Sequence, residues 1–578
     1  MLNWEEVFQK WQNYTELDAQ LKEQLETLKN DPSALEDAFY EQLSFGTGGM
    51  RGKLGPGINR MNIYTVRKAV EGLAHYLEAN TVNYKDRGVV IAYDSRYMSK
   101  EFAVETAKVL GVHGIRTYIF ESLRPTPLLS FAVRYLGTAA GVMITASHNP
   151  PEYNGFKVYN EEGSQISLEE ANNIISYIHQ VEDELAIETL NEKSLEENHL
   201  LQWIGEEVDR AYLELLLSIS KLSEDDQKRQ KDLKVVYTPL HGTGLNLVKE
   251  GLKQLHFNEV YIVEAQAVPD PEFSTVASPN PEEKAAFQYA IKLGAQVDAD
   301  VLLATDPDAD RLGVAVKNDE DEYEVLTGNQ LGSLLLDYIL RHTDEKVLTN
   351  ARMIKTIVTT ELGRAIADYY GVETVDTLTG FKYIGEKINE YDSTGETFVF
   401  GYEESYGYLI SSFARDKDAV QASVMTCEMA HYWKEKGYTL LDALNHLYET
   451  HGYYAEDLSD LKLEGVAGQE KIASIVNYFR ETEPDEFAGI KTVTIEDYWQ
   501  EKIILKNEPN RVLTTRLPRE NVIKYILEDK CWICIRPSGT EPKIKWYYGA
   551  YGKSKEEAET KLMRLNETLN NMIKTVTV

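Results

Sequence analysis

Residues 141–160 read GVMITASHNPPEYNGFKVYN, and this stretch sets the pattern that most of the chain repeats. An apolar run at residues 142–144 ends abruptly in a serine, a histidine, an asparagine and two prolines. A run of this length bounded by turn residues is typical of a buried strand. Proline fixes its own backbone and restricts the residue before it, so we expect a stiff loop that carries Ser147 and His148.

Three successive segments alternate apolar strands with helical stretches, and in each a late strand ends in a polar loop. The first contains VVIAYDSR (89–96), RTYIF (116–120) and GVMITASHNP (141–150); the second contains KVVYTPLHGTG (234–244), VYIVEA (260–265) and DVLLATDPDADR (300–311); the third contains KVLTNA (346–351), VETVDT (372–377) and TFVFGYEES (397–405). This alternation predicts an α/β protein with three mixed or mostly parallel sheets covered by helices. In such sheets, functional loops gather at the strand ends.

The last segment follows a different pattern. CWICIRPSGTEPKIKWYYGA (531–550) predicts two strands around a polar turn, and a helix follows with a capping box at residues 554–557. The apolar face of that helix comprises Ala558, Leu562, Leu565, Leu569 and Met572. We expect a smaller C-terminal α+β domain. Charged, helix-like stretches around 180–230 and 455–500 place the domains at 1–205, 206–325, 326–455 and 456–578.

Composition restricts the class of protein. The 578 residues carry 60 basic and 94 acidic side chains, a formal net charge of −34, which disfavours nucleic acid and anionic lipid as partners. The apolar runs are too short to span a membrane, and the N-terminus lacks a signal-peptide pattern. Trp4, Val7, Phe8 and Trp11 fall at helical spacing and predict an amphipathic N-terminal helix. We expect a cytoplasmic protein, and any anionic substrate would have to be bound by a local basic pocket.

Cys531 and Cys534 form a C-x-x-C pair, which in other contexts binds metal or undergoes redox chemistry. Here the pair lies in a β-type run, where residues three apart point to opposite faces. We expect no thiol site.

Three aspartates follow the strand at 301–304 at alternate positions, in the stretch DPDADR (306–311). Asp306, Asp308 and Asp310 can converge on one point, and their charges repel one another unless a cation lies among them. Hard oxygen ligands favour Mg²⁺ or Ca²⁺. An EF-hand is excluded because Arg311 occupies the position of its required glycine. The alternative is a solvated acidic turn, which the flanking apolar strands make unfavourable.

Three further stretches suit the binding of a phosphorylated sugar. RPSGTEPK (536–543) joins a guanidinium to two hydroxyls on a flexible turn, as in an anion nest, although a plain hairpin turn has similar residues. SFGTGGMRG (44–52) allows close backbone approach to a ligand and carries Arg51. GYEESYG (401–407) ends a strand with carboxylates and a serine that can bind vicinal hydroxyls; each of these stretches is also compatible with an ordinary loop.

Ser147 needs activation to act as a nucleophile. We expect the side chains of Ser147 and His148 to diverge because the residues are adjacent, which argues against a Ser-His hydrolase pair, and no G-x-S-x-G elbow is evident. His148 alternatively only caps the strand end. In phosphoryl transfer the protein mainly positions groups and neutralises charge. The stiff loop with Ser147, the aspartate loop at 306–311, the anion nest at 536–543 and the sugar loop at 401–407 together fit that chemistry.

TASHNP, DPDADR, GYEES and RPSGTEPK, in this order, resemble the α-D-phosphohexomutase superfamily over nearly the whole chain, from Gly46 to about Lys545. The resemblance is strongest to the bacterial branch that contains phosphoglucomutases and phosphopentomutases. It implies four domains around a central cleft, with the phosphoserine, metal, sugar and phosphate loops contributed by the first to the fourth domain.

The resemblance also implies the site residues. Ser147 matches the phosphoserine, and Asp306, Asp308 and Asp310 match the Mg²⁺ ligands, with a phosphoserine oxygen completing the site. The groups around the reacting centre match Arg51, His148, Lys157 and Arg311, and Lys157 resembles a general acid/base, a role that requires a lowered pKa. The sugar contacts match Glu403, Ser405 and Lys382, and the loop for the non-reacting phosphate matches Arg536, Ser538, Gly539 and Thr540.

The implied reaction interconverts α-D-glucose 1-phosphate and glucose 6-phosphate through glucose 1,6-bisphosphate, which also primes the enzyme. Tyr402, which precedes the acidic pair where many phosphoglucomutases have glycine, is typical of the pentomutase-containing branch. Phosphopentomutase or phosphomannomutase activity therefore stays open, and the protein is expected to be a monomer or a homodimer.

Two other classes compete with this interpretation. A haloacid-dehalogenase-type enzyme would use Asp306 as an aspartyl phosphate, but Asp310 stands where that class has threonine or valine. A phosphosugar-binding scaffold would keep the fold without the chemistry. The intact serine, aspartates and phosphate loop argue against such a loss.

Overall fold

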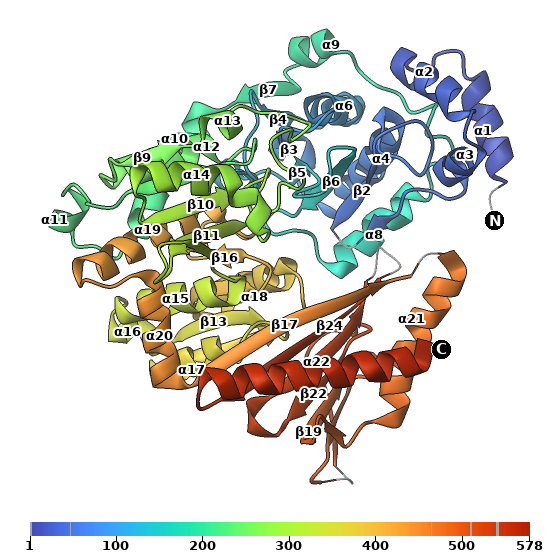
Figure 1. Cartoon of the computed structure of the whole chain (residues 1–578). Coiled ribbons are helices and arrows are strands. Elements are labelled where there is room, and N and C mark those ends of the chain that lie inside the picture. The colour runs from blue at the N-terminus through green and yellow to red at the C-terminus, as the bar shows by residue number, and fades with distance from the viewer. Residues whose placement is uncertain (1–2, 47, 464, 509–510, 539–542, 578) are drawn as a thin grey trace. The chain divides into compact units, whose positions relative to one another are not determined.

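The computed structural model describes residues 3–577 apart from 47, 464, 509–510 and 539–542 (Figure 1). The described chain divides into two compact units, and the chain passes between them within α15 (Gly328–Arg341). Unit 1 comprises residues 1–331 and 381–439, and unit 2 comprises residues 332–380 and 440–578. No helix in the described part of the chain combines the length and the apolar character that a membrane span requires.

Unit 1 begins with a small helical cluster. Asn3, Asp18 and Asp31 cap its helices, and Trp11 and Phe39 are fully buried between them. The amphipathic N-terminal helix is therefore confirmed. The helices are α1 (Trp4–Asn13), α2 (Ala19–Leu28) and α3 (Pro32–Phe39).

The first sheet of unit 1 has the strand order β1-β2-β6-β5-β3-β4-β7. Its strands are β1 (Phe45–Gly46), β2 (Gly49–Lys53), β3 (Val89–Tyr93), β4 (Thr117–Phe120), β5 (Ala140–Ile144), β6 (Tyr153–Tyr159) and β7 (Leu201–Ile204). β3, β5 and β4 are parallel, whereas β6 and β2 run antiparallel at one edge. β3 and β5 are buried along their whole length, as expected for strands covered on both faces.

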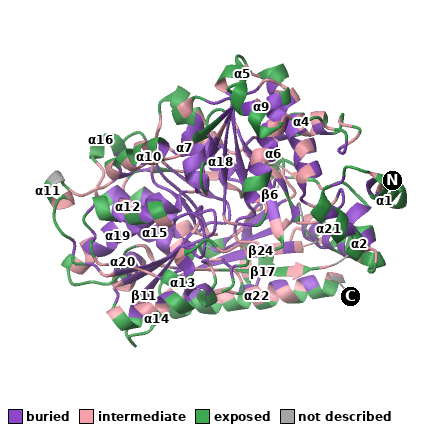
Figure 2. Cartoon of the chain, turned by 90° about the horizontal axis from the view of Figure 1, so that it is seen from above, coloured by how far each residue is buried: buried purple, intermediate pink, exposed green. Residues whose placement is uncertain are grey.

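Helices cover this sheet, and α4 packs against both α6 and α8. Figure 2 shows that buried residues follow the strands and the inward faces of the helices. The helices of this segment are α4 (Ile63–Asn80), α5 (Tyr84–Arg87), α6 (Ser99–Val112), α7 (Thr126–Leu136), α8 (Leu168–Ile178), α9 (Glu192–Glu197), α10 (Glu206–Ser218) and α11 (Glu224–Gln227).

The second sheet of unit 1 has the order β12-β11-β10-β8-β9. β10 is parallel to β8 and forms an antiparallel hairpin with β11, in which Thr305 pairs with Leu312. The elements are β8 (Val235–Thr238), α12 (Leu245–Gln254), β9 (Val260–Ile262), α13 (Glu264–Ala267), α14 (Gln288–Val297), β10 (Val301–Thr305), β11 (Leu312–Lys317) and β12 (Tyr323–Val325).

Unit 1 is completed by α18 (Phe381–Thr394), the antiparallel pair β15 (Thr397–Glu403) and β16 (Gly407–Leu409), and α19 (Ala419–Glu435). α19 is buried from Ala419 to His431 and packs against α12.

Unit 2 contains the parallel pair β13 (Ala351–Thr356) and β14 (Glu373–Thr377) with α16 (Glu345–Leu348), α17 (Glu361–Tyr369) and α20 (Leu440–His451). The expected strand at 346–351 is wrong. Asp344 caps residues 345–348 as a helical turn by accepting a hydrogen bond from the Lys346 amide at 2.8 Å, and the strand begins at Ala351.

The second sheet of unit 2 has the order β17-β24-β23-β22-β19-β20-β21, with β18 paired to β19. Its strands are β17 (Tyr453–Lys462), β18 (Glu486–Phe487), β19 (Ile490–Asp497), β20 (Lys502–Leu505), β21 (Val512–Thr514), β22 (Ile523–Leu527), β23 (Trp532–Pro537) and β24 (Lys543–Gly552). The expectation of a helical stretch over 455–500 holds only for α21 (Gly465–Thr482). β17 is charged because it is an edge strand, paired on one side with β24.

The C-terminal helix α22 (Lys555–Thr577) lies along this sheet and packs on β24 (Figure 1). Ser554 accepts a hydrogen bond from the Glu557 amide at 3.2 Å, as in the expected cap. Leu565 and Leu569 are fully buried in the core of unit 2, so the predicted apolar face is confirmed. Cys531 and Cys534 are buried free thiols, and burial raises the pKa of Cys534 to about 12.

Candidate active site

Ser147 lies in the loop that follows β5 in unit 1, and only 4% of its surface is exposed. Thr145 shapes this loop: its Oγ1 accepts a hydrogen bond from the Ser147 amide at 2.8 Å and donates to Asp94 at 2.6 Å. Ser147 has φ 54°, a left-handed conformation that residues other than glycine rarely adopt. Strain of this kind is common at functional sites, and here it directs Oγ to Asp306 Oδ2, 2.8 Å away.

Arg96 holds the Ser147 loop in place through hydrogen bonds to its backbone. Its guanidinium is buried and contacts Asp94, at a Nε–Oδ2 distance of 3.3 Å. It donates hydrogen bonds to the carbonyl oxygens of Ser147, Asn149, Pro150 and Tyr153. Arg96 was not among the site residues predicted from the sequence. The available signal was the polar DSR at the end of β3, because β3 is parallel to β5 and their ends meet at the same sheet edge.

His148 contacts Ser147 directly, with 3.1 Å between Ser147 Oγ and His148 Nδ1. The expectation that these adjacent side chains diverge is therefore wrong, because the left-handed backbone at Ser147 turns both to the same side. Burial, followed by the positive charges of Arg311 and Arg51, lowers the pKa of His148 well below its usual range. The imidazole is thus neutral near pH 7.

Asp306, Asp308 and Asp310 lie in the β10–β11 hairpin of unit 1 and are almost completely buried. Asp306 Oδ1 accepts hydrogen bonds from the amides of Asp310 and Arg311, which folds the loop back on itself. Burial and the two neighbouring carboxylates raise the pKa of Asp306 well above its usual range. The three carboxylates offer oxygens that all lie within 4.8 Å of one another.

These carboxylates fit a bound cation. Asp308 Oδ1 and Asp310 Oδ1 are buried, and neither has a hydrogen-bond partner among the described residues. A buried carboxylate oxygen without a partner is costly, and a metal ion would satisfy both at once. The predicted convergence of the three aspartates is confirmed, and an all-oxygen donor set suits a hard divalent ion.

Two lysines neutralise part of this negative charge. Lys157, on β6, lies 2.9 Å from Asp308 Oδ2 and 3.6 Å from Asp310 Oδ2. Lys417 lies 3.2 Å from Asp310 Oδ2 and 3.0 Å from Asp416 Oδ1. Lys417 was not predicted, because it reaches the site from a segment that is more than a hundred residues away in sequence.

In this arrangement the pKa of Lys157 is raised, whereas the acid/base role requires a lowered one. Burial disfavours the charge on Lys157, but the carboxylates of Asp308 and Asp310 outweigh burial and raise its pKa. Asp308 in turn has a lowered pKa: burial opposes its charge, but Lys157 more than compensates.

Arg311 and Arg51 add positive charge. Arg311 forms an ion pair with Glu282, and the carboxylates of Glu282 and Asp310 keep its pKa raised despite burial. Arg51, on β2, donates to Asn149 Oδ1 at 2.9 Å. Gly49 is required next to it, because a Cβ there would lie 2.0 Å from the carbonyl oxygen of Phe156 on β6.

The expected sugar loop ends β15 in unit 1. Glu403 is 5% exposed, and its charge contributes to the raised pKa values of both Lys417 and Arg311, which places it beside the aspartate loop. The Tyr406 carbonyl accepts a hydrogen bond from the Leu312 amide at 3.1 Å, so the turn that contains Ser405 is joined to β11. Lys382, in the first turn of α18, is 8% exposed and lies 4.8 Å from the ring centre of Tyr383.

The expected phosphate loop belongs to unit 2. Arg536, on β23, donates from Nε and Nη2 to Glu520 Oε1 at 3.2 and 3.1 Å. The Ser538 amide donates to the Lys543 carbonyl at 2.7 Å, which closes the base of the hairpin. Gly539 and Thr540 lie outside the described residues.

Comparison with known proteins agrees with this site. Four family models, described as phosphoglucomutase/phosphomannomutase α/β/α domains I, II and III and the C-terminal domain, match residues 42–185, 210–320, 327–451 and 476–566. A phosphoglucomutase from Staphylococcus aureus (strain MRSA252) is 42% identical over 513 residues, which cover 88% of this chain and 90% of the relative. One from Staphylococcus epidermidis is also 42% identical, with 89% and 91% covered.

Solved structures share the fold at lower identity. The open form of parafusin, a phosphoglucomutase from Paramecium, aligns with a TM-score of 0.68 at 16% identity and covers 93% of this chain and 96% of its own. A phosphomannomutase structure from Thermus thermophilus aligns with a TM-score of 0.67 at 22% identity, with 92% and 99% covered. From the domain matches and the identity to curated relatives, the chain belongs to the phosphoglucomutase/phosphomannomutase family of α-D-phosphohexomutases, and it is a mutase, as its sequence predicts.

Proposed function

We propose that this enzyme is a phosphoglucomutase that interconverts α-D-glucose 1-phosphate and glucose 6-phosphate. The relatives that match most of the chain carry that name. The observation that carries the proposal is the contact between Ser147 Oγ and Asp306, at 2.8 Å, inside a buried group of three carboxylates and two lysines. A serine in this position is suited to carry a phosphoryl group rather than to attack an acyl carbon.

The proposed reaction is two phosphoryl transfers. The 6-hydroxyl oxygen of glucose 1-phosphate attacks the phosphorus of phospho-Ser147; the new O–P bond forms as the bond to Ser147 Oγ breaks, and the hydroxyl proton passes to a base. The resulting glucose 1,6-bisphosphate turns over in the site. Ser147 Oγ then attacks the phosphorus at the 1-position; the new O–P bond forms as the bond from phosphorus to the sugar 1-oxygen breaks, the base returns its proton to that oxygen, and glucose 6-phosphate leaves. Glucose 1,6-bisphosphate also phosphorylates Ser147 in the resting enzyme.

We assign the metal to Mg²⁺, held by Asp306, Asp308 and Asp310 together with an oxygen of the phosphorylated serine. Such an ion supplies positive charge against the transferring phosphoryl oxygens. The fit is supported by the two partnerless carboxylate oxygens described above.

Lys157 is the candidate acid/base for the substrate hydroxyl, through its Nζ. In the described arrangement Asp308 and Asp310 hold its proton firmly, so the role requires that these charges be neutralised when the site is loaded. His148, Arg51 and Arg311 are assigned to the oxygens of the reacting phosphoryl group, where guanidinium groups bind best. Lys417 joins them as a further cation.

Glu403, Ser405 and Lys382 are assigned to the sugar. A carboxylate and a hydroxyl accept and donate hydrogen bonds to vicinal hydroxyl groups, and Glu403 already lies in the electrostatic environment of Arg311 and Lys417. Arg536, Ser538, Gly539 and Thr540 are assigned to the phosphate that does not react. The four-domain division at 205, 325 and 455 stays a prediction.

The test is an assay of glucose 1-phosphate conversion with Mg²⁺ and a trace of glucose 1,6-bisphosphate, beside ribose 1-phosphate and mannose 1-phosphate. We expect rapid turnover of the glucose substrate by the wild type and a loss of at least 10³-fold in Ser147→Ala, since the covalent carrier is removed. Ser95→Ala, in the neighbouring β3 loop, is the matched control. Preference for ribose 1-phosphate, or undiminished turnover by Ser147→Ala, would overturn the proposal.

A further inference from the structure

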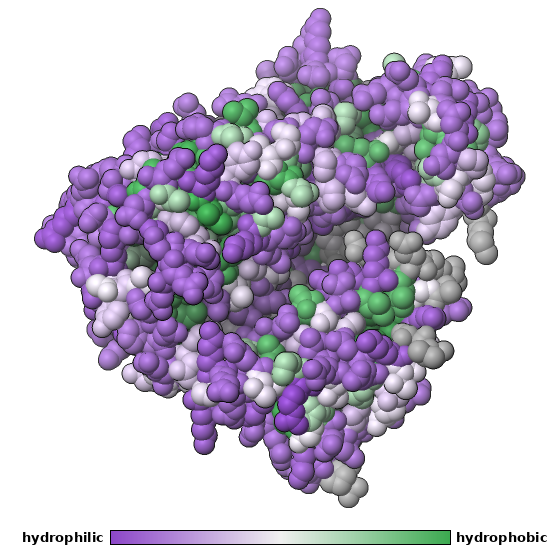
Figure 3. Space-filling view, in the orientation of Figure 1, coloured by the Kyte–Doolittle hydropathy of each residue, from purple (hydrophilic) through white to green (hydrophobic). Residues whose placement is uncertain are grey.

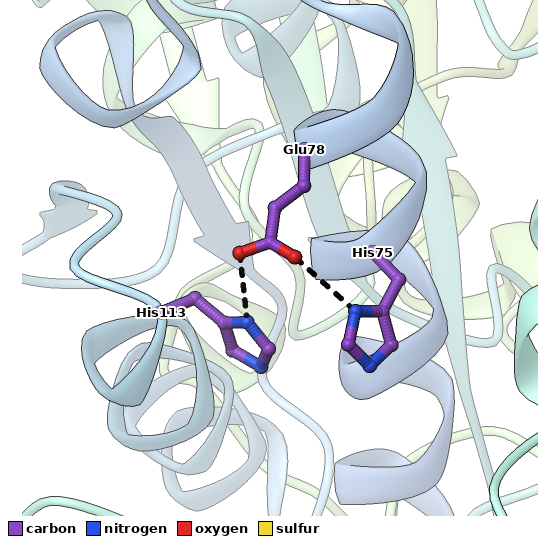
Figure 4. Close-up of side chains that lie close together, drawn as sticks. All are labelled: His75, Glu78 and His113. Atoms are coloured by element: carbon purple, nitrogen blue, oxygen red, sulfur yellow. Dashed lines mark hydrogen bonds and ion pairs between the residues drawn. The ribbon is translucent and has the colours of Figure 1, made fainter.

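Two histidines and two glutamates form a closed cluster on the outer side of the first sheet of unit 1. His75 and Glu78 lie three residues apart on α4, and His113 caps the C-terminal end of α6, which packs against α4. Figure 4 shows that both imidazole rings point to the carboxylate of Glu78. His75 Nδ1 lies 3.2 Å from Glu78 Oε2, and His113 Nδ1 lies 3.2 Å from Glu78 Oε1.

Glu71 completes the cluster on the opposite edge of the two rings. His113 Nε2 lies 3.1 Å from Glu71 Oε2, and His75 Nε2 lies 3.4 Å from Glu71 Oε1. Each ring thus presents Nδ1 to Glu78 and Nε2 to Glu71. The two glutamates therefore contact different nitrogens of the two rings: Glu78 lies beside both Nδ1 atoms, and Glu71 lies beside both Nε2 atoms.

We infer that the Nδ1 atoms of His75 and His113 and the carboxylate of Glu78 form a second metal site, for Zn²⁺ or a similar divalent transition ion. His75, Glu78 and His113 can each offer one ligand atom such that the three atoms lie within 4.8 Å of one another. In a tetrahedral zinc site with bonds of about 2.0–2.2 Å, ligand atoms are roughly 3.3–3.5 Å apart. The two nitrogen–oxygen distances of 3.2 Å are already close to that value.

Glu71 has the position of an outer-shell carboxylate. A metal-bound imidazole usually donates its other N–H to a carboxylate, which fixes the ring orientation and the tautomer. Glu71 faces Nε2 of both rings, so one carboxylate would orient both ligands. The His75 side chain is partly exposed, so the cluster is reachable from solvent.

The donor set separates this site from the aspartate loop. Imidazole nitrogens select zinc and other transition ions, whereas three carboxylates select Mg²⁺. The three cysteines are buried and do not compete for a soft metal. The site joins the end of α6 to α4, so binding would stabilise unit 1 without taking part in phosphoryl transfer, and the inference does not depend on the proposed function.

Protons compete with the metal. The hydrogen bond with Glu71 raises the pKa of His113, and Glu78 contributes in the same direction. Tyr177, on α8, is a further titratable group near this cluster, with its ring centre 6.4 Å from that of His75. Metal binding requires neutral imidazoles, so protons compete with the ion for this site.

The test is a titration of the full-length protein with Zn²⁺ in competition with a chromogenic chelator. Excess Mg²⁺ is present throughout to saturate the aspartate loop. We expect His75→Ala, Glu78→Ala and His113→Ala each to lose one equivalent of bound Zn²⁺. Glu71→Gln should keep that equivalent with about 10–100-fold weaker affinity. His179→Ala, at an exposed histidine that ends α8, is the matched control and should bind as the wild type does.

A second readout is the melting temperature, which Zn²⁺ should raise for the wild type and His179→Ala but not for His75→Ala. His75 is 41% exposed, so its variant is expected to fold even if His113→Ala does not. Equal numbers of bound Zn²⁺ in wild type and in the folded His75→Ala protein would overturn the inference and leave the cluster as a hydrogen-bonded network.

Discussion

Arg96 shows how a single side chain can fix a catalytic loop. Arg96 is 4% exposed, and its guanidinium donates to backbone carbonyls across the whole turn from Ser147 to Tyr153. Prolines restrict individual backbone angles, but they do not set where the loop lies relative to the sheet. Arg96 sets that position, because its side chain donates hydrogen bonds to the loop and forms an ion pair with Asp94 at the end of the neighbouring strand β3.

We predict that Arg96→Lys lowers kcat by about 10–100-fold. A lysine keeps the charge, but its compact ammonium cannot reach carbonyls on both sides of the turn, and each lost hydrogen bond of a charged donor costs about 1.5–3 kcal/mol. Steady-state kinetics and thermal unfolding measure both effects. Arg87→Lys is the control, because Arg87 also donates to two carbonyls but lies outside the site. A wild-type kcat in Arg96→Lys would contradict the assignment.

Asp308 is the aspartate of the loop that contacts the candidate acid/base Lys157 most closely. Asp308→Asn keeps the shape and an acceptor for Thr126, but removes a charge that faces Lys157. We predict a loss of at least 10²-fold in activity and a higher Mg²⁺ requirement. Activity measured against Mg²⁺ concentration tests this, with the exposed Asp319→Asn as control. An unchanged melting temperature with full activity would contradict the metal assignment.

At the scale of elements, the site depends on strand ends that belong to different sheets of unit 1. The β5 loop supplies Ser147, and the β10–β11 hairpin supplies the aspartates. Thr126, at the start of α7, joins the two: its amide donates to the Asp308 carbonyl at 2.9 Å and its hydroxyl donates to the Asp308 carboxylate at 3.0 Å. The segment after β8 supports the hairpin from the other side, with the Thr243 amide 2.9 Å from the Pro307 carbonyl.

The close approach of this segment gives an element-scale prediction. A Cβ at Gly242 would lie 2.4–2.5 Å from backbone atoms of Pro307. Because backbone atoms cannot move aside as a flexible side chain can, Gly242→Ala should displace the aspartate loop. We expect the Mg²⁺ concentration for half-maximal activity to rise by about 10-fold, with a smaller effect on KM for the sugar phosphate. Unchanged metal dependence would show that the loop accommodates the methyl group.

At the scale of the whole molecule, acidic charge dominates the surface. The face in Figure 3 is covered mainly by hydrophilic side chains, consistent with the formal net charge of −34. Such a charge keeps a protein soluble but opposes the approach of an anionic substrate. The partly buried cations Lys157, Lys417 and Arg311 therefore act locally, where low exposure shields them from salt.

Global stability should depend on pH through Glu456 in unit 2. Its carboxylate accepts a hydrogen bond from Thr360, which caps α17, so it links segments 96 residues apart. Burial raises the pKa of Glu456 from 4.5 to about 7. The folded state holds this proton more tightly than the unfolded chain, so the stability is fully present below about pH 4.5 and is lost as the pH rises through 7.

We predict that Glu456→Gln has the same melting temperature as the wild type at pH 5. At pH 8.5 its melting temperature should be about 2–4 °C higher than that of the wild type, which corresponds to roughly 1 kcal/mol of stabilisation. Glutamine resembles the protonated acid and still accepts from Thr360. This stabilisation is smaller than the full pKa shift of Glu456 would give, because the Glu456 side chain is only partly shielded from water. Thermal unfolding across this pH range measures the difference. A difference that shrinks with rising pH would contradict the sign.

The sequence alone determined the central buried strands, the C-terminal helix and the aspartate loop. Buried runs such as β3, β5 and β10, and the cap and apolar face of α22, depend on neighbours within a few residues, so local chemistry specifies them. Local chemistry was misleading at residues 346–351, where Asp344 caps a helical turn, and at the strand β17, where an edge position tolerates charge. The order of the motifs was sufficient to indicate the family.

Only the tertiary structure decided how these pieces act together. Arg96, Thr126 and Lys417 lie 51, 182 and 107 residues from the groups that they contact at Ser147, Asp308 and Asp310, so no local pattern reveals them. The contact of Ser147 with His148 follows from a left-handed backbone that the surrounding hydrogen bonds enforce. The raised pKa of Lys157 follows from carboxylates that another sheet supplies. Each is a long-range effect of burial and charge, which arises only when distant segments pack together.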